Sequence, residues 1–411
     1  MEVTPGYKQT DVGVIPADWD AGGLGRFWIV TDCKHVTAAF VPDGFPVASI
    51  REVQSRFVDL RNAKRTTAHF YELLIEGGRK PRPGDLILSR NATVGEVAQV
   101  TELHPPFAMG QDVCLLRKKS GDYSTEFLQA VFESPVILNQ LANLMVGSTF
   151  KRANVEQIRN FSVPMPPPPE QSAIAAALSD VDALLAGLER LIAKKRDLKQ
   201  AAMQQLLAGQ TRLPGFQGEW EETRLGHIAK IQRGASPRPI DSPIWFDENS
   251  SVGWVRISDV TRSGMFLDET TQRLSSLGVS HSRPVASGRL IMSICATVGR
   301  PIITKVDVCI HDGFVAFDGL DAEQLFVYYL LKWLEPTWSK HGQTGSQMNL
   351  NTGLINGAEI LLPPRDEQAA IAAVLSDMDA ELTTLEVRRV KTRALKQAMM
   401  QELLTGRTRL V

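Results

Sequence analysis

Two stretches of the chain carry apolar residues at alternating steps of four and three. Their positions are Ile174, Leu178, Val181, Leu185, Leu188 and Ile192 in the first stretch, and Ile371, Leu375, Met378, Leu382 and Leu385 in the second. This spacing places one narrow apolar seam along a helix and is typical of coiled-coil pairing. The pattern lapses at Lys195 and Thr392. It resumes less regularly at Leu198, Leu206, Leu395 and Leu403. We therefore predict two long helices that pair through these seams.

Both predicted helices have clear start and stop signals. Each follows a proline cluster, at 166–169 and 363–364, and opens with an acidic residue suited to the positive end of the helix dipole. Gly209 and Gly406 follow the last apolar pair, where a left-handed residue usually ends a helix. At 1.5 Å per residue, roughly 38 residues make a rod of about 57 Å.

The two helices belong to an internal repeat. Residues 170–213 align without a gap to residues 367–410, and 28 of the 44 aligned residues are identical. Weaker matches extend into the preceding regions: Trp19 and Trp220 each stand five residues before a Leu-Gly pair, and residues 84–95 match residues 288–299. Between these landmarks the halves differ, so the helices have stayed alike while the domain surfaces diverged.

The remaining regions show the patterns of small mixed domains. Short apolar runs bounded by Gly and Pro predict strands at 85–89, 97–100, 290–294 and 302–303, and longer amphipathic runs predict helices at 124–145 and 322–338. We predict an α+β fold class: two mixed α/β globular domains in a pseudo-two-fold tandem repeat, separated by two long antiparallel coiled-coil helices. The predicted boundaries are 1–165, 166–213, 214–364 and 365–411.

Composition excludes several other classes. With 411 residues, 43% apolar and 22% charged, the chain is typical of a soluble globular protein. No uninterrupted apolar run approaches the roughly 18 residues that span a bilayer, and the first residues lack a basic-then-apolar signal, so we expect a cytoplasmic protein with no membrane partner.

The four cysteines indicate neither disulfides nor a metal site. Cys33, Cys114, Cys295 and Cys309 are scattered and read as reduced thiols in protein cores. Cys309, His311 and Asp312 form the one local cluster of metal-binding types. A single Cys-x-His pair without a second pair at zinc spacing favours core packing, and we expect no metal in this chain.

The balance of charge is nearly neutral, with 45 Lys and Arg against 46 Asp and Glu. The whole chain thus offers no electrostatic case for nucleic-acid binding. A domain that reads base edges and leaves phosphate neutralisation to a partner would have the same balance.

Three motifs in fixed order carry a family resemblance. The first is Gly13-Val14-Ile15-Pro16-x-x-Trp19. The second, present twice, is the proline-rich entry into Glu-Gln, x-x-Ile and Leu-Ser-Asp-x-Asp. The third is the exit through Leu-Leu, Gly and Thr-Arg-Leu, which after the first helix leads to Trp220. By these motifs the chain resembles, over essentially its whole length, the specificity subunits of Type I restriction-modification enzymes.

The resemblance implies a non-catalytic subunit with two target recognition domains. Each domain would read one half of an asymmetric, split site in double-stranded DNA, while the helices set the spacing. Two modification subunits docked on the helices would methylate adenine at N6, and separate restriction subunits would translocate and cut DNA. S-adenosylmethionine, ATP and Mg would belong to those partners, with no cofactor in this chain. Consistently, the sequence has no phosphate-binding loop and no Asn-Pro-Pro-Tyr/Phe methyltransferase motif.

Candidate DNA-binding residues are polar clusters in the divergent regions, because Arg and Lys read guanine, and Asn and Gln read adenine. Residues 51–90 have nine Arg or Lys against five Asp or Glu, the clearest local basic excess. The first-domain candidates are Lys64, Arg65, Arg79, Lys80, Arg90, Asn91, Ser148, Thr149, Lys151 and Arg152. The second-domain candidates are Arg233, Arg238, Arg256, Arg262, Gln343, Thr344, Ser346, Gln347 and Asn349.

Two alternatives remain open from sequence. The balanced charge and long heptads would also suit a coiled-coil scaffold protein without a DNA role. The same recognition region could also be one split from a single-chain nuclease-methyltransferase.

Overall fold

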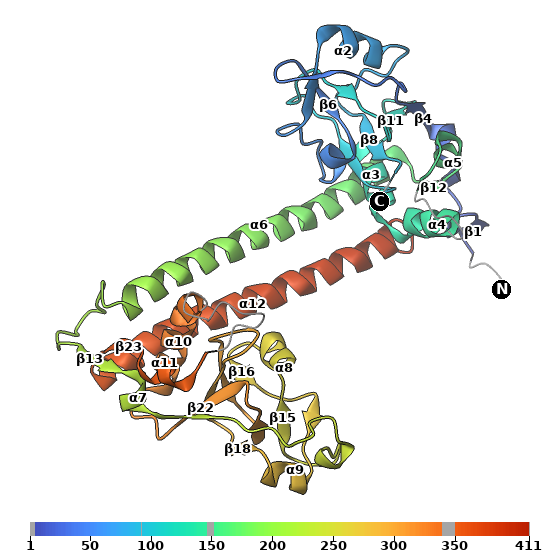
Figure 1. Cartoon of the computed structure of the whole chain (residues 1–411). Helices are drawn as coiled ribbons and strands as arrows, with labels where there is room; N and C mark the ends of the chain where they lie inside the picture. Colours follow the sequence, from blue (N-terminus) through green and yellow to red (C-terminus); the bar gives the residue numbers. More distant parts are fainter. Residues whose placement is uncertain (1–4, 92, 146–151, 339–349, 411) are drawn as a thin grey trace. The chain divides into compact units, whose positions relative to one another are not determined.

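The computed structural model describes residues 5–91, 93–145, 152–338 and 350–410 (Figure 1). The chain divides into two compact units. One consists of residues 1–189 with 387–411, and the other of residues 190–386. Each unit therefore contains one globular domain together with a part of both long helices.

The first unit begins with short strands and a one-turn helix. They are β1 (Tyr7–Thr10), β2 (Gly13–Pro16), β3 (Asp20–Gly23), α1 (Leu24–Phe27), β4 (Trp28–Asp32), β5 (Phe40–Val41), β6 (Phe45–Ala48), η1 (Ile50–Val53), β7 (Lys64–Thr66) and α2 (Ala68–Ile75). They are followed by β8 (Leu86–Ser89), β9 (Val97–Gln99), β10 (Ala108–Met109), β11 (Val113–Lys118), α3 (Thr125–Glu133), α4 (Pro135–Met145), α5 (Val155–Arg159) and β12 (Ser162–Met165). The first long helix, α6 (Pro168–Leu207), begins in this unit.

The second unit shares the main part of this order but differs in the elements between the shared strands. Its elements are β13 (Glu221–Arg224), α7 (Leu225–Ile228), β14 (Lys230–Arg233), η2 (Pro243–Trp245), β15 (Gly253–Val255), α8 (Ile257–Arg262), β16 (Phe266–Leu267), β17 (Gln272–Arg273), α9 (Ser276–Ser280) and β18 (Arg283–Val285). They are followed by β19 (Leu290–Ser293), β20 (Pro301–Thr304), β21 (Val308–Ile310), β22 (Phe314–Asp318), α10 (Gln324–Trp338), α11 (Thr352–Asn356), β23 (Glu359–Leu362) and the second long helix, α12 (Arg365–Leu403).

The sheets confirm that the two domains share one scaffold. The main sheet has the order β4-β11-β8-β9 in the first domain and β14-β22-β19-β20 in the second, where β16 adds a fifth strand. A second sheet in each domain contains a parallel pair, β10 with β6 and β21 with β15. The strands predicted at 85–89, 97–100, 290–294 and 302–303 correspond to β8, β9, β19 and β20. The predicted fold class, two mixed domains in tandem repeat, is therefore confirmed.

One predicted helix is wrong in its continuity. The amphipathic stretch 124–145 forms two helices, α3 and α4, that are interrupted at Ser134. Ser134 has φ −93° and ψ 162° because the ring of Pro135 excludes the helical conformation from the residue before it. The second predicted helix, 322–338, is a single helix, α10, and starts two residues later than predicted.

Each domain core takes in the start of one long helix and the end of the other. In the first unit, Ile174 and Leu178 of α6 and Leu403 of α12 pack with the domain residues Trp28 and Phe127. In the second unit the roles are exchanged. Ile371 and Leu375 of α12 and Leu207 of α6 pack with domain residues such as Phe326 and Tyr329. Because side chains interlock at this density, each helix end is held rigidly to a domain.

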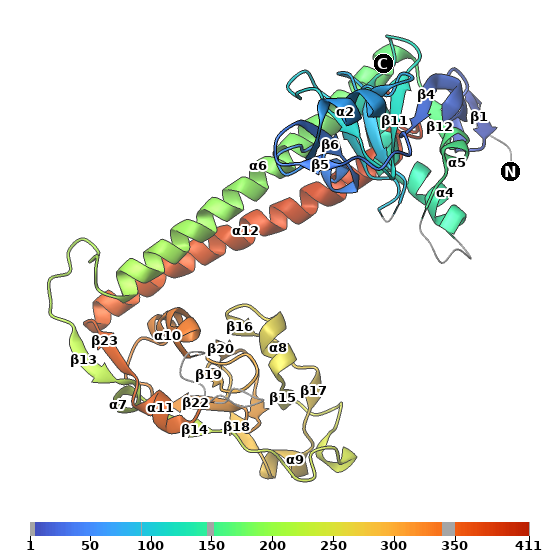
Figure 2. The same cartoon turned by 45° about the horizontal axis from the view of Figure 1, so that its top comes forward.

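Within each unit the two helix segments run antiparallel. In the first unit Lys396 contacts Asp182 at 2.8 Å, and Arg393, three residues earlier, contacts Glu189 at 3.2 Å, seven residues later. In the second unit Lys195 contacts Glu381 at 2.7 Å and Lys199 contacts Asp379. Figures 1 and 2 show α6 and α12 side by side along these segments.

The predicted seams follow the burial pattern for most of their length. All eleven predicted seam residues are buried or half-buried. The predicted resumption is wrong at Leu198 and Leu395, which are about half exposed, at 47% and 55%. At the predicted lapse, Thr392 is buried with its hydroxyl donating 2.9 Å to the Arg388 carbonyl, and Lys195 is half-buried and pairs with Glu381. The seam thus includes two polar residues, each with a hydrogen-bond or ion-pair partner.

A buried carboxylate fixes the start of each long helix. Glu170, 1% exposed, accepts 2.9 Å from the indole Nε1 of Trp19 and 2.7 Å from Nε of Arg409. Glu367, 0% exposed, accepts 3.1 Å from Trp220 Nε1 and 2.5 Å from Arg212 Nε. Charged acceptors of this kind make the stronger hydrogen bonds of proteins. The tryptophan, the glutamate and the arginine of the repeated motifs therefore meet at one point in each unit.

The neighbouring glutamine of each Glu-Gln pair joins the helix start to its domain. Gln171 accepts 2.9 Å from the Ser124 amide and donates 2.8 Å to the Pro166 carbonyl. Gln368 accepts 2.7 Å from the Glu323 amide and donates 2.8 Å to the Pro363 carbonyl. Each glutamine thus ties its own long helix to the start of α3 or to the segment just before α10.

The predicted glycine stops are confirmed. Gly209 and Gly406 have φ of 65° and 68°, in the left-handed region that favours glycine. Each also packs closely on a tryptophan, so that a Cβ would come within 3.3 Å of Trp220 at Gly209 and 3.2 Å of Trp19 at Gly406. The exit motif therefore needs glycine for the turn and for this contact.

Among the described residues, α6 is the one helix long and apolar enough to satisfy a composition test for membrane spans. Its most apolar 18-residue window has a mean hydropathy of 1.2, and a third of that window is buried. The sequence contains no uninterrupted run of that length, and core helices of soluble proteins pass the same test. Burial of Ile174 and Leu178 in the first domain core accounts for part of the apolar character.

We predict that Glu170→Ala lowers the free energy of unfolding of the first unit by about 1 to 3 kcal/mol, because it leaves the buried indole N–H of Trp19 without its acceptor and removes one of the two carboxylates paired with Arg409. Urea titration followed by hydrogen exchange measures this unit by unit. Combining Glu170→Ala with Arg409→Ala should cost less than the sum of the single changes, since both remove one interaction.

The matched control is Glu156→Ala, which removes an ion pair to Arg159 whose side chains are 71% and 47% exposed. We expect it to cost less than about 1 kcal/mol. If Glu170→Ala and Glu156→Ala lower the free energy of unfolding equally, the buried carboxylate does not fix the start of the long helix.

Candidate nucleic-acid interface

The same main-chain contacts define one edge of the main sheet in both domains. In the first domain, the amide of Arg90 donates 2.8 Å to the carbonyl of Asp112, and the amide of Ala153 donates 2.9 Å to the carbonyl of Arg90. In the second domain, Ile294 donates 2.8 Å to Gly313, and Leu350 donates 2.9 Å to Ile294. We call these two surfaces the first and second recognition edges.

Three segments build each recognition edge. They are the residues at and after the end of β4 or β14, the turn that enters β11 or β22, and the loop that follows β8 or β19. The Gly-Ser segments that the sequence nominates directly precede Arg152 and Leu350, next to these edges in the chain. The common backbone frame and the different side chains make these edges the natural candidates for reading two different ligands.

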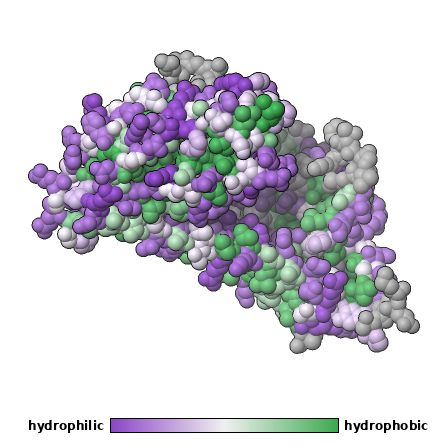
Figure 3. Space-filling view, turned by 90° about the horizontal axis from the view of Figure 1, so that it is seen from below, coloured by the Kyte–Doolittle hydropathy of each residue, from purple (hydrophilic) through white to green (hydrophobic). Residues whose placement is uncertain are grey.

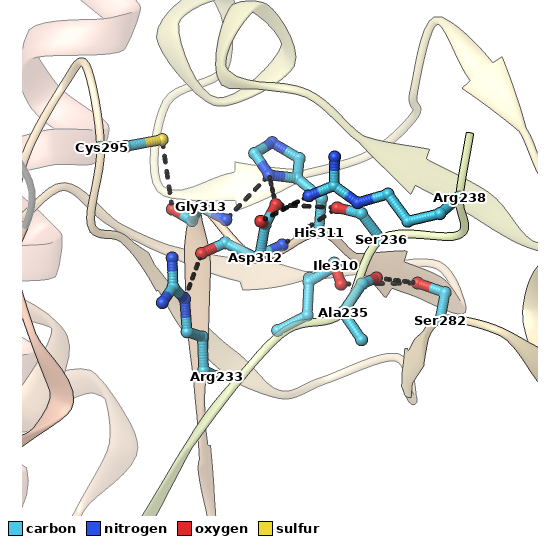
Figure 4. Close-up of polar contacts among 10 residues, drawn as sticks. All are labelled: Arg233, Ala235, Ser236, Arg238, Ser282, Cys295, Ile310, His311, Asp312 and Gly313. Atoms are coloured by element: carbon cyan, nitrogen blue, oxygen red, sulfur yellow. Dashed lines mark hydrogen bonds and ion pairs between the residues drawn. The ribbon is translucent and has the colours of Figure 1, made fainter. Parts of the chain in front are cut away.

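At the second recognition edge, Asp312 lies between two arginines (Figure 4). Arg233 Nε donates 2.6 Å to the Asp312 carbonyl oxygen, while Arg238 approaches the carboxylate at 3.4 Å. The Ser236 hydroxyl donates 2.7 Å to the same carboxylate. All of these groups come from the end of β14, the segment after it and the turn before β22.

Close backbone packing holds this arrangement in place. At Gly234 a Cβ would lie 2.2 Å from the His311 carbonyl oxygen, so only glycine lets the chain leave β14 this close to the turn. The Ala235 amide then donates 3.1 Å to the Ile310 carbonyl. Across the edge, Cys295 donates through Sγ to the Gly313 carbonyl at 3.8 Å (Figure 4).

The charges at the second recognition edge follow from burial and from these bonds. Burial would raise the pKa of Asp312, but the Ser236 hydrogen bond and the nearby His311, Arg233 and Arg238 together lower it. Burial lowers the pKa of His311 and outweighs the opposing effect of Asp312. At neutral pH this gives an ionised aspartate, two cationic arginines and an uncharged imidazole.

The first recognition edge corrects one sequence prediction. Arg90 is 3% exposed, and its guanidinium forms an ion pair with Asp32 at 2.6 Å and contacts Cys33 Sγ at 3.7 Å. A guanidinium enclosed in this way cannot reach a base edge, so Arg90 is a structural residue that holds β4 to the segment after β8. Arg90 was predicted to bind DNA because residues 51–90 are locally rich in basic residues. Composition alone does not distinguish a buried arginine from an exposed one.

The other first-domain candidates differ in solvent exposure and in whether their side chains are already hydrogen-bonded. Lys64 and Lys80 are exposed, with the Lys64 ammonium 4.8 Å from the ring centre of Phe40. Arg65 donates 2.9 Å to the Gly44 carbonyl, and Arg79 Nε donates 2.9 Å to the Asp32 carbonyl. Asn91 and Arg152 form a β-bridge beside the first recognition edge.

The structure adds residues that the sequence did not nominate. A groove of about 490 Å³ reaches from Lys64 to the first recognition edge, and Asn62, Gln111 and Asp112 also line it. Asp112 has φ 69°, a conformation that costs energy outside glycine and is often found at functional sites. By the pairing of β11 with β8 and of β22 with β19, Gln111 is at the position equivalent to that of Asp312 in the second domain. The only sequence signal for it was its place just before a strand.

Two further second-domain candidates lie around α8. The buried carboxylate of Asp259 accepts 2.9 Å from the amide of Arg256, the residue before α8, and contacts the Arg262 side chain at 3.2 Å. Arg262 is 53% exposed and remains at the surface, whereas Arg256 is half-buried. The remaining candidates lie outside the described residues: Ser148, Thr149, Lys151, Gln343, Thr344, Ser346, Gln347 and Asn349.

Two clusters have metal-binding residue types. Cys309 packs in a core with Trp245 and Trp254, and burial raises its pKa to about 11, which fits the core-packing interpretation. In the described part of the chain, Asp32, Cys33 and His35 bring ligand atoms within 4.8 Å of one another. The Asp32 carboxylate is already paired with the guanidinium of Arg90, and burial raises the pKa of the Cys33 thiol. This set of side chains is therefore a poor fit for a metal cation.

Comparison with known proteins relates both domains to DNA recognition. The family model described as Type I restriction modification DNA specificity domain matches residues 62–195 and 217–392. The chain is 24% identical to the putative type I restriction enzyme MjaX specificity subunit of Methanocaldococcus jannaschii, over 98% of this chain and 96% of that protein. It is 21% identical to the type I restriction enzyme EcoBI specificity subunit of Escherichia coli, over 84% of this chain and 75% of that protein.

Solved structures share the fold. A chain from a study of complex assembly and conformational transition of the type I R-M system superposes with a TM-score of 0.65 at 22% identity, covering 95% of this chain and 99% of that one. The HsdS subunit from Thermoanaerobacter tengcongensis gives a TM-score of 0.53 at 22% identity, covering 95% and 98%. The S subunit from M. genitalium gives 0.58 at 14% identity, covering 98% of both chains.

Proposed function

Because the chain belongs to the Type I restriction-modification DNA specificity family, we propose that it reads an asymmetric, two-part DNA sequence, one half with each domain. The observation that carries this proposal is the pair of recognition edges, built on the same main-chain bonds but with different side chains. Gln111 and Asp312 lie at equivalent positions of the two edges. Since an amide and a carboxylate beside arginines favour different base edges, the two half-sites differ in sequence.

The chemistry belongs to partner subunits in this proposal. Two modification subunits methylate adenine at N6 with S-adenosylmethionine, and restriction subunits use ATP and Mg to move along and cut DNA in the cytoplasm. Neutralisation of phosphates by these partners explains why this chain carries 45 basic against 46 acidic residues. The chain itself selects the sequence.

The long helices are the docking surface for the modification subunits. In the first unit, apolar Leu184, Val387 and Val390 are between 43% and 60% exposed, and in the second unit Leu191 and Leu198 are 39% and 47% exposed. Figure 3 shows hydrophobic residues in small patches among hydrophilic ones on the face that it presents. Apolar side chains on an exposed helix face suit packing against helices of a partner.

The helices also set the gap between the half-sites. α6 has 40 residues, about 60 Å of continuous helix, and each of its ends is packed into a domain core. The length of a continuous helix is set by its number of residues. The number of residues in α6 and α12 therefore sets the gap between the half-sites.

The family match weighs against the scaffold alternative. A coiled-coil scaffold has no need of two diverged domains on a common frame, and the matched regions include most of both domains. A region split from a single-chain nuclease-methyltransferase would need no separate modification subunit to direct. Neighbouring genes for modification and motor subunits distinguish this second alternative from the proposal.

The test of the proposed function is to express the chain with its modification partner in a host without adenine methylation and to map N6-methyladenine over the genome. We expect one split motif whose two halves differ, and no methylation when the chain is omitted. A single undivided motif, or methylation that does not depend on this chain, would contradict the proposal.

A second prediction concerns the gap. Removing one heptad from each helix, residues 183–189 and 389–395, keeps the antiparallel register and shortens the rod by about 10 Å. At 3.4 Å per base pair, we expect the mapped gap to shorten by about three base pairs while both half-sites keep their bases.

The control is Ala183→Ser in the full-length helix, an exposed position within the removed segment, which changes composition without changing length. Altered bases with an unchanged gap in the heptad-deleted chain would overturn the role of the helices in spacing.

A further inference from the structure

The second recognition edge contains a preorganised arginine pair. Arg233 is fixed by the 2.6 Å bond from its Nε to the main-chain carbonyl of Asp312, and Arg238 faces the carboxylate of the same residue at 3.4 Å. Ser236 fixes the other carboxylate oxygen at 2.7 Å (Figure 4). One aspartate therefore sets the direction of two guanidinium groups, through its main chain for one and its side chain for the other.

Both arginines still present donors to the outside. Arg233 is exposed and is held through Nε, so the bond that fixes it does not use its two terminal amino groups. Arg238 is 71% exposed, and Asp312 is 44% exposed. A guanidinium held at one side and open at the other is suited to a bidentate hydrogen bond with a planar acceptor pair.

Resting on the proposed function, we propose that Arg233 and Arg238 read guanine in the half-site of the second domain, and that Asp312 is their positioning residue. Guanine presents O6 and N7 side by side in the major groove, and arginine is the side chain that most often binds this pair. Other base edges in the groove lack two adjacent acceptors. Arginines restrained before binding also lose less side-chain entropy when they bind.

The surroundings favour base reading over phosphate binding. A phosphate-binding site gathers positive charge, whereas here an ionised carboxylate offsets one of the two arginines and the neighbouring His311 is uncharged. The carboxylate would repel a phosphate placed against it. The carboxylate thus leaves the arginine N–H donors in place but offsets much of their positive charge. Contacts that select a base depend on such directional hydrogen bonds and less on net charge.

In the described residues of the first recognition edge, Asp32 also holds two arginines, Arg79 through its main-chain carbonyl and Arg90 through its carboxylate. These two arginines are not free in the same way, because Arg90 is buried and Arg79 also donates through Nη1 to the Glu76 carbonyl. By strand pairing, Asp32 at the end of β4 corresponds to Arg233 at the end of β14, and Gln111 corresponds to Asp312. Asp32 is engaged by the buried guanidinium of Arg90. Among the described residues the exposed arginine pair is thus found at the second recognition edge, and changes there should leave the first half-site unaffected.

The experiment uses the chain assembled with its modification partner and duplexes that carry the mapped motif. Each guanine of the second half-site is replaced in turn by 7-deazaguanine, which keeps base pairing but lacks the N7 acceptor. For the unchanged complex we expect affinity to fall about 5-fold to 100-fold at one or two positions, the range for one bidentate contact. In Arg233→Gln or Arg238→Gln complexes, the replacement at the corresponding position should have no further effect.

Asp312→Asn tests the positioning role. It keeps the main-chain carbonyl that holds Arg233 but removes the charge that faces Arg238. We expect preference for guanine over 7-deazaguanine to fall at the position read by Arg238 and to persist at the position read by Arg233, with the salt dependence of binding unchanged. The matched control is Arg224→Gln, an arginine of the same unit that pairs at 3.4 Å with Glu359 away from this edge.

Two results would overturn the inference. If the arginine variants weaken binding to all duplexes equally and make it less sensitive to salt, the arginines contact phosphates. If they have no more effect than Arg224→Gln, the second recognition edge does not read DNA. Failure of the proposed function is distinguishable from both, because the unchanged complex would then show no split motif at all.

Discussion

The buried carboxylate at the start of each long helix is the constraint on which the architecture depends. Glu170 and Glu367 have no access to water, so their charge must be met by the protein. In each unit the partners are a domain tryptophan and the arginine that follows the end of the other long helix. Burying a charge is tolerable only with all these partners in place. Each unit is therefore complete only when its domain, one helix start and the other helix end come together.

This constraint explains which parts of the repeat could diverge. The residues that build the helix starts and ends are shared between the halves because they serve the same two junctions. The recognition edges are held by main-chain hydrogen bonds, which do not depend on side-chain identity. Side chains at the edges can therefore change without disturbing the frame. A Gln in one domain and an Asp between two arginines in the other are the result.

The sequence predicted features that depend on local pattern and missed those that depend on contacts between distant residues. The seams, the left-handed Gly209 and Gly406, and four strands follow from periodicity and turn chemistry. Pro135 was a visible signal for the break between α3 and α4, but the apolar periodicity outweighed it. The ion pair that buries Arg90 joins residues 58 positions apart, and no local pattern marks it. For the same reason the sequence took Glu170 as a dipole partner only, although its carboxylate joins both ends of the chain.

The central claim is that each domain recognises its own half-site independently while the two long helices are common to both. Exchange of a single domain tests this claim most directly. Residues 214–364 would be replaced by the corresponding domain of a relative with a different mapped site, leaving both long helices unchanged. The account predicts a methylated motif in which one half and the gap are retained and the other half is that of the relative. A motif changed in both halves would contradict it.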